Sequence, residues 1–365
     1  MNLNLFDSFQ LGSNTLNNRV VMAPMTRLRA DGNVPTKLMA KYYAQRASAG
    51  LIITECTMVA PSSQGYMNVP GIYNEAQIAG WKLVTDAVHD ANGKIFLQLW
   101  HCGRVSHSAL LNGLEPVAPS AIAGQGKLHT PLGKVDLETP RALSITEIQE
   151  ITAQFAAGAA NAQQAGFDGV ELHGAFGYLI DQFLQDGSNQ RHDNYGGSLE
   201  NRARFLLEVM AAVTEVWGGD RVGIKLSPSN TFYGISDSNP QETFSYVIKA
   251  LNEYNLAYIH LMEPNEIDLD TREVINPVLP VFRPLYSGNI ITNGGYDRDS
   301  GEQAIASGGA QLVSYGKPYI ANPDLVARFK QNATIEEPNP KTFYGRGDTE
   351  NAIIGYTNHL TMLGE

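Results

Sequence analysis

Cysteine is scarce in this chain of 365 residues, which contains only Cys56 and Cys102. They lie far apart and form no C-x-x-C motif, so they cannot build a disulfide framework, which suits a reducing cytosol. No apolar run reaches 18 residues, and no positively charged region precedes an apolar segment at the start of the sequence. We therefore expect a cytoplasmic protein without a membrane span.

Positive charge is also in deficit, with 26 Lys and Arg against 37 Asp and Glu and a net charge of -11. This balance does not predict the basic surface that binding of nucleic acid requires. The sequence has no G-x-x-x-x-G-K-[ST], and "GQGKLH" at Gly124 lacks the third glycine and the preceding strand of a dinucleotide-binding fingerprint. The group His101, Cys102 and His107 matches no common zinc spacing, so we expect no metal.

The chain is rich instead in short apolar runs that alternate with amphipathic segments. Eight strands are expected, at residues 19–24, 50–56, 94–100, 169–173, 221–227, 257–262, 289–293 and 311–316. A strand followed by a helix, repeated eight times, predicts an α/β fold, a closed parallel TIM (β/α)8 barrel, as a single domain over residues 1–365. A hairpin is expected at residues 9–20. Residues 104–140 break the rhythm and predict a long excursion after the third strand that caps the site.

Two helix starts carry capping signals. Ser144 lies three residues before Glu147, the spacing of a capping box. Further on, Asn322 followed by Pro323 predicts an N-cap and a first helical turn for the last helix.

The stretch "GVELHGAFGYLIDQFL" at residues 169–184 predicts a strand, a turn and a helix. Side chains alternate along a strand, so Glu171 and His173 share one face, opposite their apolar neighbours. Phe176 and Tyr178 fall on the turn. Because functional groups gather at the C-terminal ends of barrel strands, these side chains are expected at the mouth of the barrel.

Glycines follow the last two predicted strands. Gly294 and Gly295 come after the seventh strand, and Gly316 and Lys317 come after the eighth. Bare backbone amides and one cation at these two places are typical of a phosphate site in such barrels.

Several long motifs resemble the old yellow enzyme family of FMN-dependent ene reductases. They are "PMTR" at 24–27, "QLWHCGR" at 98–104, "ELHGAFGYLIDQFL" at 171–184, "NQRHDNYGGSLENRARF" at 189–205 and "GKPYIANPDL" at 316–325. The resemblance runs over almost the whole chain. It implies FMN held without a covalent bond at the barrel mouth, NADPH or NADH as reductant, and electrophilic alkenes as substrates. Such substrates carry a carbonyl or nitro group, and the expectation extends to nitrate esters.

The resemblance also assigns residues to the cofactor. The flavin ring is assigned to Pro24, Met25, Thr26, Cys56, Gln98 and Lys225, and the phosphate to Asn293, Gly294, Gly295, Gly316 and Lys317. Thr26 would donate to the isoalloxazine O4 and Gln98 would bind the pyrimidine edge. Lys225 would place positive charge beside N1 and O2. Lys225 and Lys317 stand where arginine is usual in the family.

For the substrate, the resemblance implies that His173 donates a hydrogen bond to the carbonyl or nitro oxygen. Tyr178 would give the proton to the α-carbon, since a tyrosine hydroxyl is neutral at physiological pH and can donate to a developing enolate. Trp100 and Tyr344 would border the pocket. Phe176 departs from the family pattern, which has histidine or asparagine there, because a phenyl ring cannot donate a hydrogen bond.

Two alternatives stay open from the sequence. A TIM-barrel hydrolase would need two carboxylates facing one cleft, for which Glu171 and Glu263 are candidates. A flavoprotein with altered or lost reductase activity would explain Phe176. The sequence does not choose between NADPH and NADH, between a monomer and a small homo-oligomer, or among individual substrates.

Overall fold

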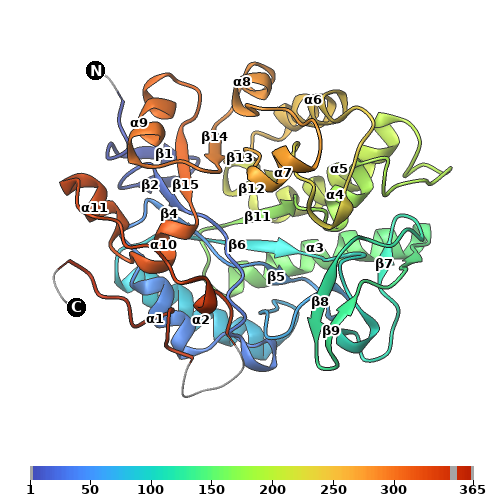
Figure 1. The fold of residues 1–365 in the computed structure, drawn as a ribbon, viewed down its shortest axis with the longest axis horizontal. Helices are drawn as coiled ribbons and strands as arrows, with labels where there is room; N and C mark the ends of the chain where they lie inside the picture. Colours follow the sequence, from blue (N-terminus) through green and yellow to red (C-terminus); the bar gives the residue numbers. More distant parts are fainter. Residues whose placement is uncertain (1–2, 346–351, 363–365) are drawn as a thin grey trace.

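The barrel predicted from the sequence is present in the computed structural model, which describes residues 3–345 and 352–362. Its eight strands are β3 (Val20–Met22), β4 (Leu51–Ile53), β6 (Ile95–Trp100), β11 (Gly169–Gly174), β12 (Val222–Leu226), β13 (Tyr258–Met262), β14 (Ile290–Asn293) and β15 (Leu312–Tyr315). They pair in parallel in this order, and the last strand, β15, pairs with the first, β3, which closes the barrel (Figure 1). A short β5 (Thr57–Met58) also pairs with β6.

Helices follow the strands and cover the outside of the barrel. The longer ones are α1 (Lys37–Ala44), α2 (Glu75–Asp90), α3 (Ile145–Gln164), α5 (Leu199–Trp217), α6 (Pro240–Leu251), α9 (Arg298–Ala306) and α11 (Leu325–Gln331). The shorter ones are α4 (Leu179–Leu184), α7 (Glu266–Thr271), α8 (Leu279–Phe282) and α10 (Lys317–Ala321). Among the described residues, no helix is both long enough and apolar enough to cross a membrane.

One of the two predicted helix caps is confirmed and the other is wrong. Ser144 and Glu147 form the expected capping box at the start of α3. The N-cap of α11, however, is Asp324. Asn322 instead ends α10, where its side-chain amide donates to the carbonyls of Pro318 and Glu336. The Asn-Pro pattern misleads because a short helix that the sequence does not announce ends at the same place.

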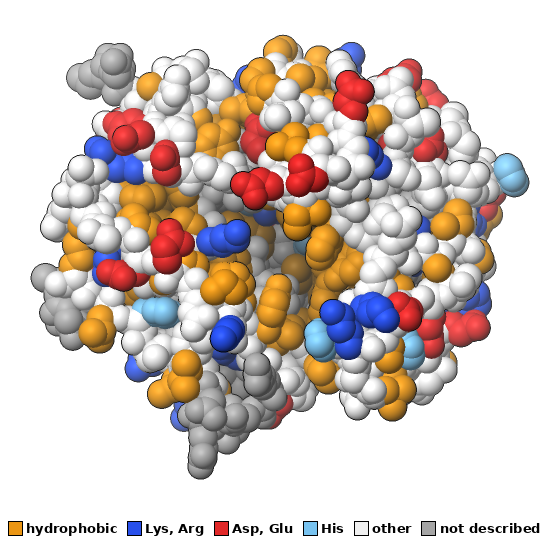
Figure 2. All heavy atoms as spheres, viewed as in Figure 1, with side chains coloured by type: hydrophobic (Ala, Val, Ile, Leu, Met, Phe, Trp, Pro, Cys, Tyr) orange, Lys and Arg blue, Asp and Glu red, His pale blue; other side chains and the backbone are white. Residues whose placement is uncertain are grey.

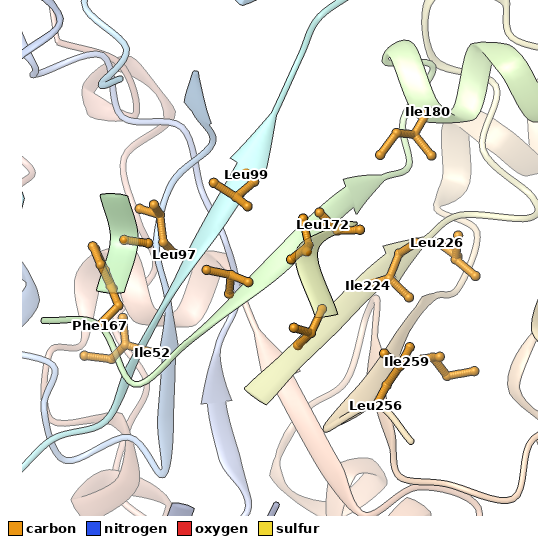
Figure 3. Packing of buried hydrophobic residues seen from close by; sticks show 14 of the residues in the cluster. Ile52, Leu97, Leu99, Phe167, Leu172, Ile180, Ile224, Leu226, Leu256 and Ile259 are labelled. Carbon is orange, nitrogen blue, oxygen red and sulfur yellow. The ribbon is translucent and has the colours of Figure 1, made fainter. Parts of the chain in front are cut away.

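The strands send apolar side chains in both directions. Outward side chains such as Leu97, Leu99 and Leu172 are fully buried against the helices (Figure 3). Burying each one contributes about 1.5 to 3 kcal/mol. Inward side chains at the N-terminal end of the barrel form a second cluster, closed by Leu11 and Leu16 of the predicted hairpin β1 (Phe9–Leu11) and β2 (Asn14–Leu16). This apolar floor leaves only the C-terminal end of the barrel for polar groups.

The segment after β6 contains strands that the sequence did not predict. An antiparallel hairpin joins β8 (Lys127–Thr130) to β9 (Gly133–Asp136), and β7 (Val117–Ala118) pairs with β10 (Arg141–Ala142). Exposed and buried residues alternate along β8, but two buried positions are too few to distinguish a strand from a loop in the sequence. Leu128 and Leu137 pack in one cluster with side chains of the barrel mouth.

The end of the chain folds back against the loop that follows β3. Tyr356 is fully buried and stacks on Tyr42 of α1, with ring centroids 4.0 Å apart. The Arg27 guanidinium donates to the carbonyls of Phe343 and Gly355, both at 2.8 Å. The C-terminal segment is thereby fixed to α1 and to the loop that follows β3.

Candidate active site

A pocket opens at the C-terminal ends of the strands, and Figure 2 shows a hollow near the middle of the face viewed, with hydrophobic side chains around it. The pocket is lined by Pro24, Thr26, Cys56, Gln98, His173, Phe176, Tyr178, Lys225 and Phe232. Eight of these nine residues were predicted as site residues. Phe232 was missed, although its position just after a strand end was a usable signal.

One wall of the pocket is held by a hydrogen-bonded row of buried side chains. The Cys56 thiol donates to Gln98 Oε1 at 3.2 Å, and Gln98 Nε2 donates to Glu171 Oε1 at 2.8 Å. Burial raises the pKa of Cys56 to about 12, so this cysteine is a neutral thiol and not a nucleophile. Because an ionised carboxylate only accepts hydrogen bonds, Glu171 orients the amide of Gln98.

The row continues through a histidine and a serine that the sequence analysis missed. His260 Nδ1 lies 2.8 Å from Glu171 Oε2, and His260 Nε2 lies 2.7 Å from Ser314 Oγ. Burial, together with the charge of Lys225, lowers the pKa of His260 to about 4, so the imidazole is neutral. Its one proton is on Nδ1, donated to the carboxylate, and Nε2 accepts from the serine hydroxyl. The sequence offered a signal for both residues, because each is a polar residue at an inward position of a predicted strand.

Lys225 places a cation at the base of the pocket. Its Nζ donates to Asn293 Oδ1 at 3.2 Å and lies 5.4 Å from the centre of the Phe176 ring. Burial lowers the pKa of Lys225 to about 8, while the negative charge of Glu171 opposes this shift. Asn293 Nδ2 donates to the Ser314 carbonyl at 2.9 Å, so both polar ends of Asn293 are engaged. Its contact with a phosphate stays a prediction.

His173 is a neutral hydrogen-bond donor. Burial, followed by the charge of Lys225, holds its pKa well below the usual range. His173 Nδ1 accepts from the backbone N–H of Ala175 at 3.3 Å, which leaves the ring proton on Nε2 for an acceptor in the pocket. Tyr178 lies beside it, with ring centroids 4.9 Å apart and ring planes at 84°.

The turn between His173 and Tyr178 is fixed by side chains. Phe176 has a φ of 57°, an unusual value for a residue with a side chain. Its backbone N–H donates to Ser227 Oγ at 2.9 Å, and the next backbone N–H, that of Gly177, donates to Asp181 Oδ2 at 2.9 Å. These two bonds hold the phenyl ring in the pocket wall.

Three further predicted site residues lie outside the lining. Trp100 is fully buried behind Tyr178, with ring centroids 5.1 Å apart in an edge-to-face contact. Tyr344 is 59% exposed, and Met25 is half-buried next to Gly316. Direct contacts of these three residues with a ligand stay predictions.

The predicted phosphate loops lie at neighbouring strand ends, since β14 pairs with β15. Gly294 and Gly295 have φ values of 115° and 74°, which favour glycine. A Cβ at Gly295 would meet nothing within 4 Å, so its backbone is open to a ligand. Lys317 is exposed at the start of α10. Open backbone and a cation beside a buried polar pocket fit a flavin nucleotide with its phosphate at the rim.

The carboxylates that a hydrolase would need are used elsewhere. Glu171 is bound within the barrel, as described above, and Glu263 accepts from the backbone N–H groups of Val278 and Leu279 at 2.6 and 2.8 Å. Neither lines the pocket. No group of three His, Cys, Asp or Glu side chains with metal-binding geometry occurs in the described part of the chain.

The family assignment comes from comparison with known proteins. A model of the NADH:flavin oxidoreductase / NADH oxidase family matches residues 4–336. The chain belongs to this family. It is 43% identical over 379 residues to 12-oxophytodienoate reductase 7 of Oryza sativa subsp. japonica, covering 99% of this chain and 95% of that protein.

Solved structures of the family agree with this assignment. Morphinone reductase in complex with tetrahydroNAD has a TM-score of 0.92 and 44% identity, covering 99% of this chain and 98% of that one. The old yellow enzyme homologue from Zymomonas mobilis has a TM-score of 0.92 and 40% identity, covering 98% and 99%. The resemblance to the old yellow enzyme family is therefore confirmed. The chain is an FMN oxidoreductase that uses NAD(P)H, with the general activity of an ene reductase.

Proposed function

We propose that this chain reduces alkenes conjugated to a carbonyl or nitro group, with His173 and Tyr178 as its catalytic residues. FMN, when bound, would supply the hydride chemistry between NADPH or NADH and the β-carbon of the alkene. The observation that carries the proposal is the pairing of a neutral imidazole N–H and a tyrosine hydroxyl side by side in one pocket. The related rice and morphinone reductases act, by their names, on 12-oxophytodienoate and morphinone.

In this proposal His173 binds the substrate oxygen through Nε2–H. Negative charge develops on that oxygen as hydride arrives, so a preset donor stabilises the transition state more than the ground state. A neutral histidine suits the role because the positive charge of Lys225 already lies nearby. Phe176 leaves the oxygen without a second side-chain donor at its position, which narrows the accepted substrates to those that one donor can hold.

Tyr178 supplies the proton to the α-carbon. Burial raises its pKa well above the ordinary value, so the hydroxyl stays protonated at physiological pH. A weak acid of this kind protonates a strongly basic enolate and is itself restored from solvent.

The proposal also treats the chain as one FMN-binding domain, with the cofactor held without a covalent bond. The excursion at residues 104–140 would cap the pocket, which is supported by the packing of Leu128 and Leu137 with Tyr178 in one cluster. A cytoplasmic location, a monomeric or small homo-oligomeric state, and activity on nitrate esters remain predictions.

The test separates the two half-reactions by stopped flow, using 2-cyclohexenone, a nitroalkene and a nitrate ester as oxidants. In Tyr178→Phe, we expect reduction of the flavin by NADPH to keep nearly the parental rate. Reoxidation by the enone should fall by roughly 10² to 10⁴, the usual contribution of a positioned general acid. Equal slowing of both half-reactions would show that the tyrosine positions ligands and another group supplies the proton.

A further inference from the structure

Three tyrosine hydroxyls form a continuous chain beside the pocket. Tyr66, in the loop that follows β5, lies with its hydroxyl 3.0 Å from that of Tyr178. The same Tyr66 hydroxyl also contacts the hydroxyl of Tyr233, in the loop that follows β12. Neither Tyr66 nor Tyr233 was singled out from the sequence, and neither lines the pocket.

The number of protons fixes the direction of this chain once a substrate is bound. A tyrosine hydroxyl donates one hydrogen bond only. When Tyr178 points its proton at the substrate, its contact with Tyr66 requires Tyr66 to be the donor. The proton of Tyr66 is then used, so its contact with Tyr233 requires Tyr233 to donate. The chain therefore runs from Tyr233 through Tyr66 to Tyr178.

The surroundings hold the three rings in place. Trp100 stacks on Tyr66 with ring centroids 5.9 Å apart, and it contacts the edge of Tyr178. The carbonyl of Tyr233 accepts from the backbone N–H of Gln125 in the excursion at 2.9 Å. Tyr178 is only 7% exposed, whereas Tyr66 and Tyr233 are both half-buried. One end of the chain is thus at the pocket and the other is near solvent.

We propose that Tyr66 and Tyr233 form a proton relay that restores Tyr178 during reduction of the alkene, an inference that rests on the proposed role of Tyr178. The Tyr178 O–H bond breaks as a C–H bond forms at the α-carbon. In the same step Tyr66 gives its proton to Tyr178 and Tyr233 gives its proton to Tyr66. Tyr233 then takes a proton from solvent water, which leaves all three residues as they began.

The electrostatics of Tyr178 agree with a donor at Tyr66. Burial raises the pKa of Tyr178 well above its usual value, and the hydrogen bond from Tyr66 acts in the opposite direction. Burial likewise raises the pKa of Tyr66, and its hydrogen bonds with Tyr178 and with Tyr233 raise it further. Negative charge that develops on the Tyr178 oxygen as its proton leaves is therefore stabilised by its neighbour.

The experiment compares Tyr66→Phe and Tyr233→Phe with Tyr178→Phe and with the control Tyr254→Phe, whose hydroxyl donates to the Leu207 carbonyl on the outer helices. We expect Tyr66→Phe to slow reoxidation by 2-cyclohexenone about 10- to 100-fold, as for loss of a hydrogen bond to a charged group, and to leave flavin reduction unchanged. Tyr233→Phe should slow reoxidation less. In mixtures of H₂O and D₂O, the rate should depend on deuterium content along a curve in the parent and along a line in Tyr66→Phe.

A second measurement is independent of turnover. With 3-fluorotyrosine at position 178, ¹⁹F NMR should show a higher pKa for that residue in Tyr66→Phe than in the parent. If Tyr178→Phe loses reoxidation while Tyr66→Phe keeps the parental rate or an unchanged isotope curve, the relay is wrong and the role of Tyr178 stands. If Tyr178→Phe itself keeps the parental rate, the proposed function fails and the relay fails with it.

Discussion

Replacing Glu171 tests whether the buried row beneath the pocket sets the charge of Lys225. Glu171→Leu leaves the side-chain N–H groups of Gln98 and His260 without an acceptor. Glu171→Gln removes the charge but allows repair. Its oxygen can accept from Gln98 and its amide can donate to His260 Nδ1, provided that the histidine proton moves to Nε2 and is donated to Ser314.

The two variants should therefore differ in stability. Each orphaned buried donor costs about 1 to 3 kcal/mol, so Glu171→Leu should lower the free energy of unfolding by about 2 to 6 kcal/mol. Glu171→Gln should lose less than about 1.5 kcal/mol, because the hydrogen bonds are rebuilt. Urea denaturation measures both. Glu263→Gln is the matched control, because Glu263 directly follows β13 and its carboxylate accepts from the backbone N–H groups of Val278 and Leu279 at the start of α8, away from the row.

Both variants should lower the pKa of Lys225 further. An opposite charge nearby typically shifts a pKa by 1 to 3 units, and burial already lowers that of Lys225 to about 8. The contribution of the ammonium group to FMN binding is present below the pKa of the free protein and is lost as the pH rises through it. In fluorescence titrations of the apoprotein, that loss should begin near pH 8 in the parent and about one unit or more lower in Glu171→Gln. The same pH profile in both proteins would refute an electrostatic role for Glu171.

Substitutions at three other positions have expected outcomes. Lys317→Ala should weaken FMN binding by about 1 to 3 kcal/mol in the same titration, and an unchanged affinity would remove Lys317 from the phosphate site. Phe176→Asn should raise enone turnover about 3- to 30-fold, less than a full oxyanion donor, with a smaller change in flavin reduction; no gain would mean that Phe176 does not occupy the missing donor's place. Asp181→Ala should lower the free energy of unfolding by about 2 to 6 kcal/mol, because the N–H donors of Gly177 and Gln185 lose their acceptor. Asp181→Asn should be tolerated, since Gln185 Oε1 has no partner and can accept from the new amide. Burial raises the pKa of Asp181 to about 7. Its contribution to the free energy of unfolding is therefore present below about pH 4 and is lost as the pH rises to 7. Urea denaturation should show that this free energy depends less on pH in Asp181→Asn than in the parent.

Much of the pocket was predictable because, in a barrel, a residue's place at the end of a strand in the sequence determines its place in space. Each strand is a short apolar run with a recognisable end, and all eight ends meet at one face. His173, Lys225 and Gln98 could therefore be placed together, although more than 120 residues separate the first and last of them along the chain. The specific roles came from the family resemblance and not from the spacing.

The parts that escaped prediction depend on contacts between distant segments. His260 and Ser314 look like single polar residues in apolar strands, and only the closed barrel brings them within hydrogen-bonding distance of each other. Tyr66 and Tyr233 lie in loops without periodicity, so no local pattern marks them. Asn322 was misread because a local cap signal competes with a tertiary partner, the backbone of Glu336.

Two separate polar networks meet at this pocket, and their separation has a physical reason. The row from Gln98 to Ser314 lies inside the barrel, where fixed charge and neutral histidine can hold a cation without exchanging protons with water. The tyrosine chain lies in the loops above, where one end is near solvent. A proton donor that must be restored at every turnover needs such access, whereas a group that sets charge beneath a flavin is better shielded from it. Phe176 stands between the two, in contact with Lys225 on one side and His173 on the other, and adds no titratable group to either.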